Sequence, residues 1–177
     1  MSMIIDGTNG LTFNDSSTQA SAGKILQVVQ TVKTDTFTTL STSYVDITNF
    51  SVSITPKFST SKILVMYNME ISAGGADVNH VYLQLYRNST AIFIATTAGS
   101  RTSATSVVNT ATTGTMYPTN ACYLDSPATT SATTYKVQIK TSSGSYNACV
   151  NRSSRDNDAA AYDGRAVSSI TVMEIAA

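Results

Sequence analysis

Short segments in which apolar and polar residues alternate recur along the chain from residue 24 to its end. In the clearest of them, residues 62–72, every second residue is apolar: Ile63, Val65, Tyr67, Met69 and Ile71. Segment 80–88 repeats the pattern with Val81, Leu83 and Leu85. Because successive side chains of a strand point to opposite faces, the pattern predicts strands with one buried face. About ten such segments occur, and none has convincing helical periodicity, so we expect an all-β fold.

The composition supports this expectation. The 28 Thr among 177 residues make β-branched side chains abundant, and 24 residues are Ser. Strong helix formers are scarce, with only two Glu. That balance excludes a coiled coil or a helix bundle. Two antiparallel sheets that cover each other's apolar faces are the natural solution, and we predict an antiparallel β-sandwich of jelly-roll type. We also expect separate strands at 44–47 and 50–55, a loop or irregular edge at 34–43, and hairpins over 80–96 and around 142–144.

The first 22 residues differ from the rest of the chain. They contain Gly7, Gly10 and a run of Ser, Thr, Gln and Ala residues, which is typical of an extended, turn-rich segment. We therefore divide the chain into an extended N-terminal arm, 1–22, and a β-sandwich knob domain, 23–177.

The charge of the chain argues against several partners. Eleven basic residues balance eleven acidic ones, and charged residues make up only 12%, about half of the usual share. A neutral chain has no electrostatic footprint for nucleic acid, and no apolar run is long enough for membrane insertion. The N-terminal residues lack the basic and apolar regions of a secretory signal, so we expect synthesis in the cytoplasm without a signal peptide.

Side chains that could carry out catalysis are scarce. A Ser-His-Asp triad would have to use His80, the single histidine, and no Ser lies in a G-x-S-x-G setting. Metal-ligand spacing is also missing, so we predict no catalytic residue, no metal, no cofactor and no enzymatic activity. Cys122 and Cys149 lie in alternating segments, and this leaves buried free thiols and a cross-strand disulfide as open alternatives.

One segment, 152–165, concentrates the charge. It interleaves three arginines with three aspartates, and its spacing does not match a calcium-binding loop, so a solvated or interface loop is the preferred interpretation. Aromatic rings and charged hydrogen-bonding groups are also what saccharide recognition uses. If these loops contact a saccharide or another binding partner, the candidate contact residues are therefore Tyr146, Arg152, Arg155, Asp156 and Tyr162.

Two predicted strands are apolar or aromatic on both faces. These are 24–33 and 80–88, and a monomeric sandwich needs only one apolar face per strand. The second face could pack against a symmetry mate. We name Val29, Tyr82 and Tyr86 as candidate oligomer-interface residues; the alternative for the two tyrosines is that they lie under a loop.

Three stretches carry a resemblance. GTNGLTFNDSSTQASA (7–22) is similar to a segment common in bacteriophage tail-fibre and virion-associated proteins, where it precedes a C-terminal globular module. GKILQVVQ (23–30) and Tyr44-Val45-Asp46, with SVSITPKFSTSKILV (51–65) and the terminal SSITVMEI (168–175), resemble that module, which is frequent in phages of cyanobacteria and other aquatic bacteria. The resemblance spans both ends and about a third of the chain. One departure is that fibres of this kind carry a long shaft before the module, whereas about 22 residues precede it here.

The resemblance implies a protein on the surface of the virion, a homotrimer with a jelly-roll or tumour-necrosis-factor-like knob. It implies other virion proteins of the capsid, tail or baseplate as partners through residues 1–22, and a host surface polysaccharide or protein as receptor. A capsid decoration or cement protein, or a head fibre anchored by the arm, is the alternative. A cellular carbohydrate-binding β-sandwich module is a further one.

Overall fold

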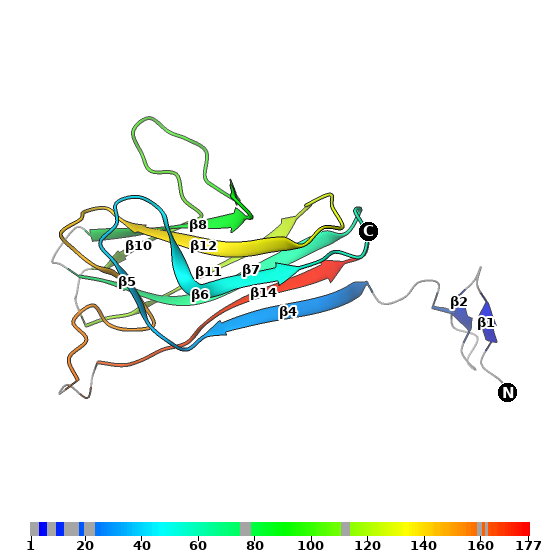
Figure 1. Cartoon of the computed structure of the whole chain (residues 1–177), viewed down its shortest axis with the longest axis horizontal. Coiled ribbons are helices and arrows are strands. Elements are labelled where there is room, and N and C mark those ends of the chain that lie inside the picture. The colour runs from blue at the N-terminus through cyan, green and yellow to red at the C-terminus, as the bar shows by residue number, and fades with distance from the viewer. Residues whose placement is uncertain are drawn as a thin grey trace.

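The structure is a computed structural model, and it describes residues 4–6, 10–12, 18–19, 24–74, 79–110, 114–158, 161 and 163–177. All regular elements in these ranges are strands (Figure 1). None of the described residues belongs to a helix long and apolar enough to cross a membrane.

Two antiparallel sheets form the sandwich, and their strand order is that of a jelly roll. One sheet has β14 (Ser168–Ile175) between β4 (Ile25–Lys33) and β7 (Lys62–Ala73), with β11 (Tyr117–Asp125) on the other side of β7. The other has the order β10 (Ser106–Thr110), β8 (Asn79–Arg87), β12 (Thr133–Thr141), β6 (Val45–Ile54). In each sheet, one strand therefore lies between two strands that precede it in the chain: β14 in the first sheet and β12 in the second. This order is that of two interleaved Greek keys. The prediction of an all-β sandwich of jelly-roll type is confirmed.

Short strands complete the architecture. β9 (Thr90–Ile92) pairs with β8, and β13 (Ala148–Val150) lies between β7 and β5 (Phe37–Thr39). Near the N-terminus, β1 (Ile4–Asp6), β2 (Gly10–Thr12) and β3 (Thr18–Gln19) form a sheet of their own, within the range assigned to the arm.

The core lies between the two sheets, where the alternating residues meet. The inward side chains of β7 and β8, among them Ile63, Met69, Val81, Leu83 and Leu85, are almost completely buried. At the open side of the sandwich, side chains of β4 close the gap to the edge strand β6. Gln27 Nε2, Thr31 Oγ1 and Lys33 Nζ each donate to a backbone carbonyl at 2.8 Å, on Thr55, Ser51 and Thr48 respectively.

Three local expectations need correction. The segments 44–47 and 50–55 belong to one strand, β6, in which Asn49 takes a positive φ of 59°. Asn tolerates this left-handed conformation, so the strand continues past an irregularity that looked like a break. The segment 34–43, predicted as a loop or an irregular edge, contains a short regular strand, β5, which lies at the edge of its sheet.

The hairpin predicted over 80–96 forms as β8 and β9, but the one around 142–144 does not. β12 pairs with β6 and β8, whereas β13 pairs with β5 and β7 in the other sheet, so the chain crosses between sheets at this turn.

The two cysteines are free and lie in different environments. Cys149 is buried, and Cys122 is exposed on the outer face of β11, opposite Met66 of β7. A cross-strand disulfide is therefore wrong, and the expectation of a buried thiol holds for Cys149 alone.

Candidate functional site

The charged loop predicted from the sequence leaves and re-enters the sandwich at one point. It connects β13 to β14, and its base is closed by an antiparallel bridge between Arg152 and Arg165. Next to this bridge, Ala166 N donates to Asn151 O at 3.1 Å. The closed base thus brings the two ends of this loop together at the end of the sandwich.

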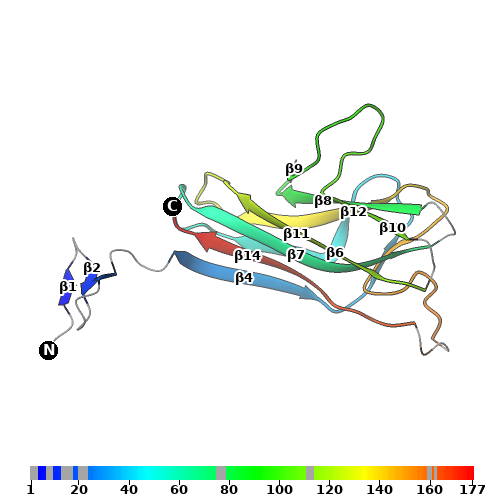
Figure 2. The ribbon, with the colours of Figure 1, turned by 180° about the vertical axis from the view of Figure 1, so that it is seen from behind.

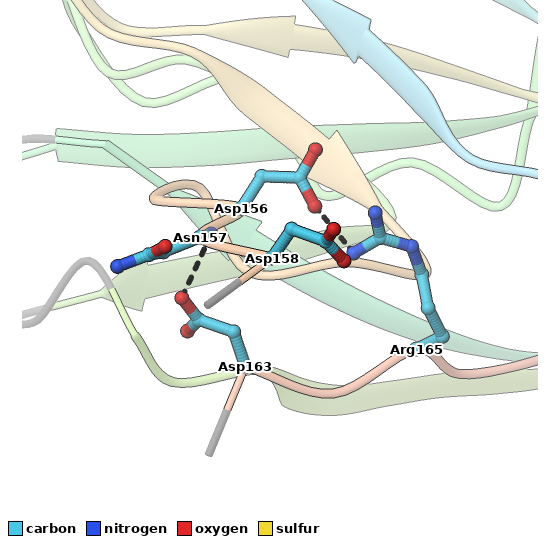
Figure 3. A pocket seen from close by; sticks show the side chains of 5 residues that line it. All are labelled: Asp156, Asn157, Asp158, Asp163 and Arg165. Carbon is cyan, nitrogen blue, oxygen red and sulfur yellow. Dashed lines mark hydrogen bonds and ion pairs between the residues drawn. The ribbon is translucent and has the colours of Figure 1, made fainter. Parts of the chain in front are cut away.

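Five of its six charged residues pair with one another. Arg155 binds Asp163, with 2.7 Å between Nη2 and Oδ1, and Arg152 binds Asp156, with 2.9 Å between Nη1 and Oδ2. Arg165 forms a second ion pair with Asp156 (Figure 3). The alternating arginines and aspartates of the sequence are thus a network that orders the loop.

Asp163 is the centre of this network. Its side chain is 1% exposed and accepts hydrogen bonds from Ser153 Oγ, from Nε and Nη2 of Arg155, and from Asn157 N at 2.9 Å (Figure 3). The Arg155 guanidinium, helped by the other donors, holds the pKa of this carboxyl well below its ordinary value of 3.8. Asp163 therefore latches the loop in its ionised form.

A small polar pocket opens beside the latch. It has a volume of about 160 Å³, below the roughly 300 Å³ at which drug-sized ligand sites begin. Figure 3 shows the residues that line it: Asp156, Asn157, Asp158, Asp163 and Arg165. Such a pocket offers charged hydrogen-bonding groups to one polar group of a larger ligand, such as a hydroxyl of a saccharide. Among the described side chains, no three His, Cys, Asp or Glu residues are grouped as metal ligands would be.

The structure brings together most of the receptor-contact candidates. Arg152, Arg155 and Asp156 lie in the network just described. Tyr146 is 41% exposed on the turn between β12 and β13. Gly74 lies between that turn and the charged loop. Its N–H donates to Asn147 O of the turn at 2.9 Å, and a Cβ added to Gly74 would lie 3.8 Å from Ser154 of the loop. Tyr162 falls outside the described residues.

The oligomer-interface candidates lie on different surfaces. Val29 packs against the core, so the outward apolar residues of β4 are Val28 and Val32, 54% and 52% exposed. Tyr82 and Tyr86 lie half-buried on the outer face of β8. Their role as interface residues stays a prediction.

The partners of these tyrosines were not predicted from the sequence. Lys140 Nζ lies between two rings, 5.1 Å from the centroid of Tyr44 and 5.2 Å from that of Tyr82, and Lys136 lies 6.0 Å from that of Tyr86. Burial raises the pKa of Tyr44 to about 12, so its hydroxyl stays protonated and donates to Ser103 O. The sequence does contain a signal for these contacts. Both lysines alternate with the apolar residues of 133–141, so they lie on the outer face of the sheet, as the tyrosines do.

Replacing the latch residue tests the loop network. We expect Asp163→Asn to release the loop, because the neutral amide cannot hold the Arg155 guanidinium. Tryptic cleavage after Arg155 should become at least about tenfold faster, whereas the same change at exposed Asp158 should leave it unaltered. Equal cleavage rates in the two variants would contradict the latch.

The low pKa of Asp163 gives a pH prediction. A group whose pKa is depressed on folding contributes stability above its unfolded pKa, here 3.8, and loses it only as the pH falls through the lower folded value. The ¹³C resonance of the Asp163 carboxyl should therefore stay at its ionised position from pH 7 down to about pH 3. A midpoint near 3.8 would contradict this.

Comparisons with known proteins give structural likeness only. No family model and no curated protein matches the sequence. Among solved structures, the chain is similar to a chain of the T13 IBDV viral particle, with a TM-score of 0.44 and 15% identity over 90% of this chain and 38% of the other. It is also similar to a chain of T=1 particles derived from infectious bursal virus, with a TM-score of 0.45 and 15% identity over 98% and 44%. The chain thus spans less than half of the length of both.

Proposed function

We propose that this chain is a non-enzymatic structural protein of a bacteriophage particle, a trimeric knob whose end loops contact the host surface. The observation that carries the proposal is the jelly-roll strand order, which recurs in viral coat and lectin domains. A fold does not fix a function, so this step is an analogy. The resemblance of residues 7–22 and of the strands that follow to virion-associated proteins narrows it to phage particles.

The two loops that meet at Gly74 are the proposed receptor-contacting end. They combine the exposed ring of Tyr146 with the polar pocket of the charged loop, which together suit a saccharide. The opposite end offers a matched control, because Phe58, 55% exposed, lies on the β6–β7 turn.

Competition for host cells tests the receptor role. We expect the purified knob to block adsorption of particles, and Tyr146→Ala to weaken the block at least about tenfold. Phe58→Ala should leave the block unchanged, since its side chain lies at the far end. A wild-type knob that fails to compete would contradict receptor binding.

Deleting residues 1–22 tests attachment through the arm. Both sheets of the sandwich lie within residues 24–177, and β1 to β3 pair only with one another, so the truncated chain should fold with an unchanged unfolding temperature. We expect it to be absent from purified particles, as detected by immunoblotting. Incorporation of the truncated knob at the wild-type level would exclude the arm as the attachment element. Imaging of particles with a tagged knob would then separate a tail location from the decoration of a capsid.

A further inference from the structure

The outer face of the β4–β14–β7–β11 sheet carries an apolar band that nothing in the described chain covers. Figure 2 shows these four strands side by side. Their pairing places four outward residues in one row, which runs across the sheet as Val28, Met173, Leu64 and Leu124. The two outer members of the row, Val28 and Leu124, are 54% and 50% exposed. An apolar row of this kind marks a surface that binds another protein.

Charge on this face is confined to two positions. Lys33, Asp125 and Glu174 of the same strands are buried. Among the outward positions of the four strands, only Lys62 and Glu70 of β7 are charged. Lys62 Nζ donates to Ser126 Oγ, and Glu70 has no side-chain partner in the described part of the chain. Neither therefore has an oppositely charged partner among the described residues of its own subunit.

The two charges are symmetric about the middle of the strand. Lys62 and Glu70 lie four residues before and four residues after Met66, which is about 13 Å in each direction along β7. Consider a two-fold axis that lies in the plane of the face and crosses β7 at right angles at Met66. The β7 strands of the two subunits then run in opposite directions. Lys62 of each subunit lies over Glu70 of the partner subunit.

We propose that a second copy of this chain docks face to face on this sheet across a two-fold axis at Met66, held by the apolar band and two reciprocal Lys62–Glu70 ion pairs. Val28 then faces Val32 of the partner subunit, and the rest of the band faces the partner's uncharged Ser169, Asn68 and Asn120. The inference deepens the self-assembly part of the proposed function. It is a different contact from the three-fold one of the trimer.

The size of the face is sufficient for such a contact. Four strands about 4.8 Å apart and nine residues long cover about 570 Å². Two copies would therefore bury about 1,100 Å², just above the roughly 1,000 Å² that a specific interface needs. An interface of this size predicts a reversible, concentration-dependent dimer.

Exchange of the two charges tests the two-fold arrangement. In Lys62→Glu and in Glu70→Lys, like charges oppose each other twice, so each should raise the dimer Kd at least about tenfold in sedimentation equilibrium. The double exchange restores both pairs and should return the Kd to within about threefold of wild type. Asp158→Lys, in the charged loop and outside the four strands of the face, is the control and should leave the Kd unchanged. Failure of the double variant to recover would overturn the proposal, as would single variants that associate like wild type.

These measurements distinguish the two-fold contact from the three-fold contact of the proposed trimer. A species of two subunits, sensitive to the exchange, supports the two-fold contact even if no trimer forms. A trimer that is indifferent to all three variants overturns it and leaves the proposed function standing. Matching unfolding temperatures of the variants show that they are folded.

Cys122 provides an independent measurement, because it pairs with Met66 and therefore lies on the axis. Packed sheets lie about 10 Å apart, beyond the roughly 7 Å between Cα atoms that a disulfide allows, so a short bismaleimide is the suitable cross-linker. We expect a cross-linked dimer in wild type and none in Cys122→Ser, since Cys149 is buried. Equal cross-linking of wild type and Lys62→Glu would overturn the arrangement.

Discussion

Replacing Glu174 by Gln should destabilise the knob by about 3 kcal/mol, because Glu174 is a fully buried carboxylate with several donors aimed at it. Its Oε1 accepts from Lys57 N at 2.7 Å and its Oε2 from Gln27 Nε2 at 2.6 Å. These bonds tie the turn after β6 to the ends of β4 and β14. A glutamine would direct an amide group at donors that need an acceptor, and urea unfolding would measure the loss.

Glu70 is the matched control, since these are the only two glutamates in the chain. Its side chain has no partner in the described part of the chain, so Glu70→Gln should change the unfolding free energy of the monomer by less than about 0.5 kcal/mol. Equal effects of the two substitutions would contradict the anchoring role of Glu174.

The destabilisation should also depend on pH. Desolvation alone would raise the pKa of Glu174, but the hydrogen bonds it accepts outweigh desolvation and lower the pKa below 4.5. The stability that this carboxylate contributes is therefore complete above pH 4.5 and is lost as the pH falls through the folded value. The difference between wild type and Glu174→Gln should shrink accordingly in acid.

Removing the carboxylate of Asp125 should cost about 3 kcal/mol, because it is a buried charge that two donors share. Asp125 is 3% exposed, and it accepts from Arg87 Nη1 at 2.9 Å and from the Tyr135 hydroxyl at 2.7 Å. Asp125→Ala removes the acceptor of the buried Tyr135 hydroxyl and leaves Arg87 Nη1 with only Ser126 O, at 3.4 Å. Thermal and urea unfolding should both show the loss.

A surface ion pair gives the comparison. Asp46 binds Lys136 at the same kind of distance, 2.8 Å, but its side chain is 56% exposed. Asp46→Ala should therefore cost no more than about 1 kcal/mol. If Asp46→Ala and Asp125→Ala destabilise equally, burial is not what gives the Asp125 cluster its effect.

The sequence was sufficient for the strands with the clearest alternation and for the direction of their side chains. Alternation over 62–72 and 80–88 identified β7, β8 and their buried faces, because period-two patterns depend only on local geometry. The sheet to which a strand belongs does not follow from such a pattern. β12 and β13 flank a short turn like that of a hairpin, yet they lie in opposite sheets because each finds its partners elsewhere in the chain.

The charged sites were only partly predictable. The interleaved signs of 152–165 indicated a charged loop, but the sequence does not show that Asp163 would gather its donors inward, since that depends on how the loop folds back on itself. Glu174 was overlooked, although it alternates in phase with Ile170 and Val172 and so points into the core. A charged residue on the apolar face of a strand is a signal for a buried, hydrogen-bonded carboxylate.

The composition of purified particles tests whether this knob is a component of a virus particle. Quantitative mass spectrometry of particles banded in a density gradient should find the chain in a fixed ratio to the major coat protein. That ratio should persist after a high-salt wash. A chain that remains in the soluble fraction of the lysate and is missing from banded particles would contradict the account.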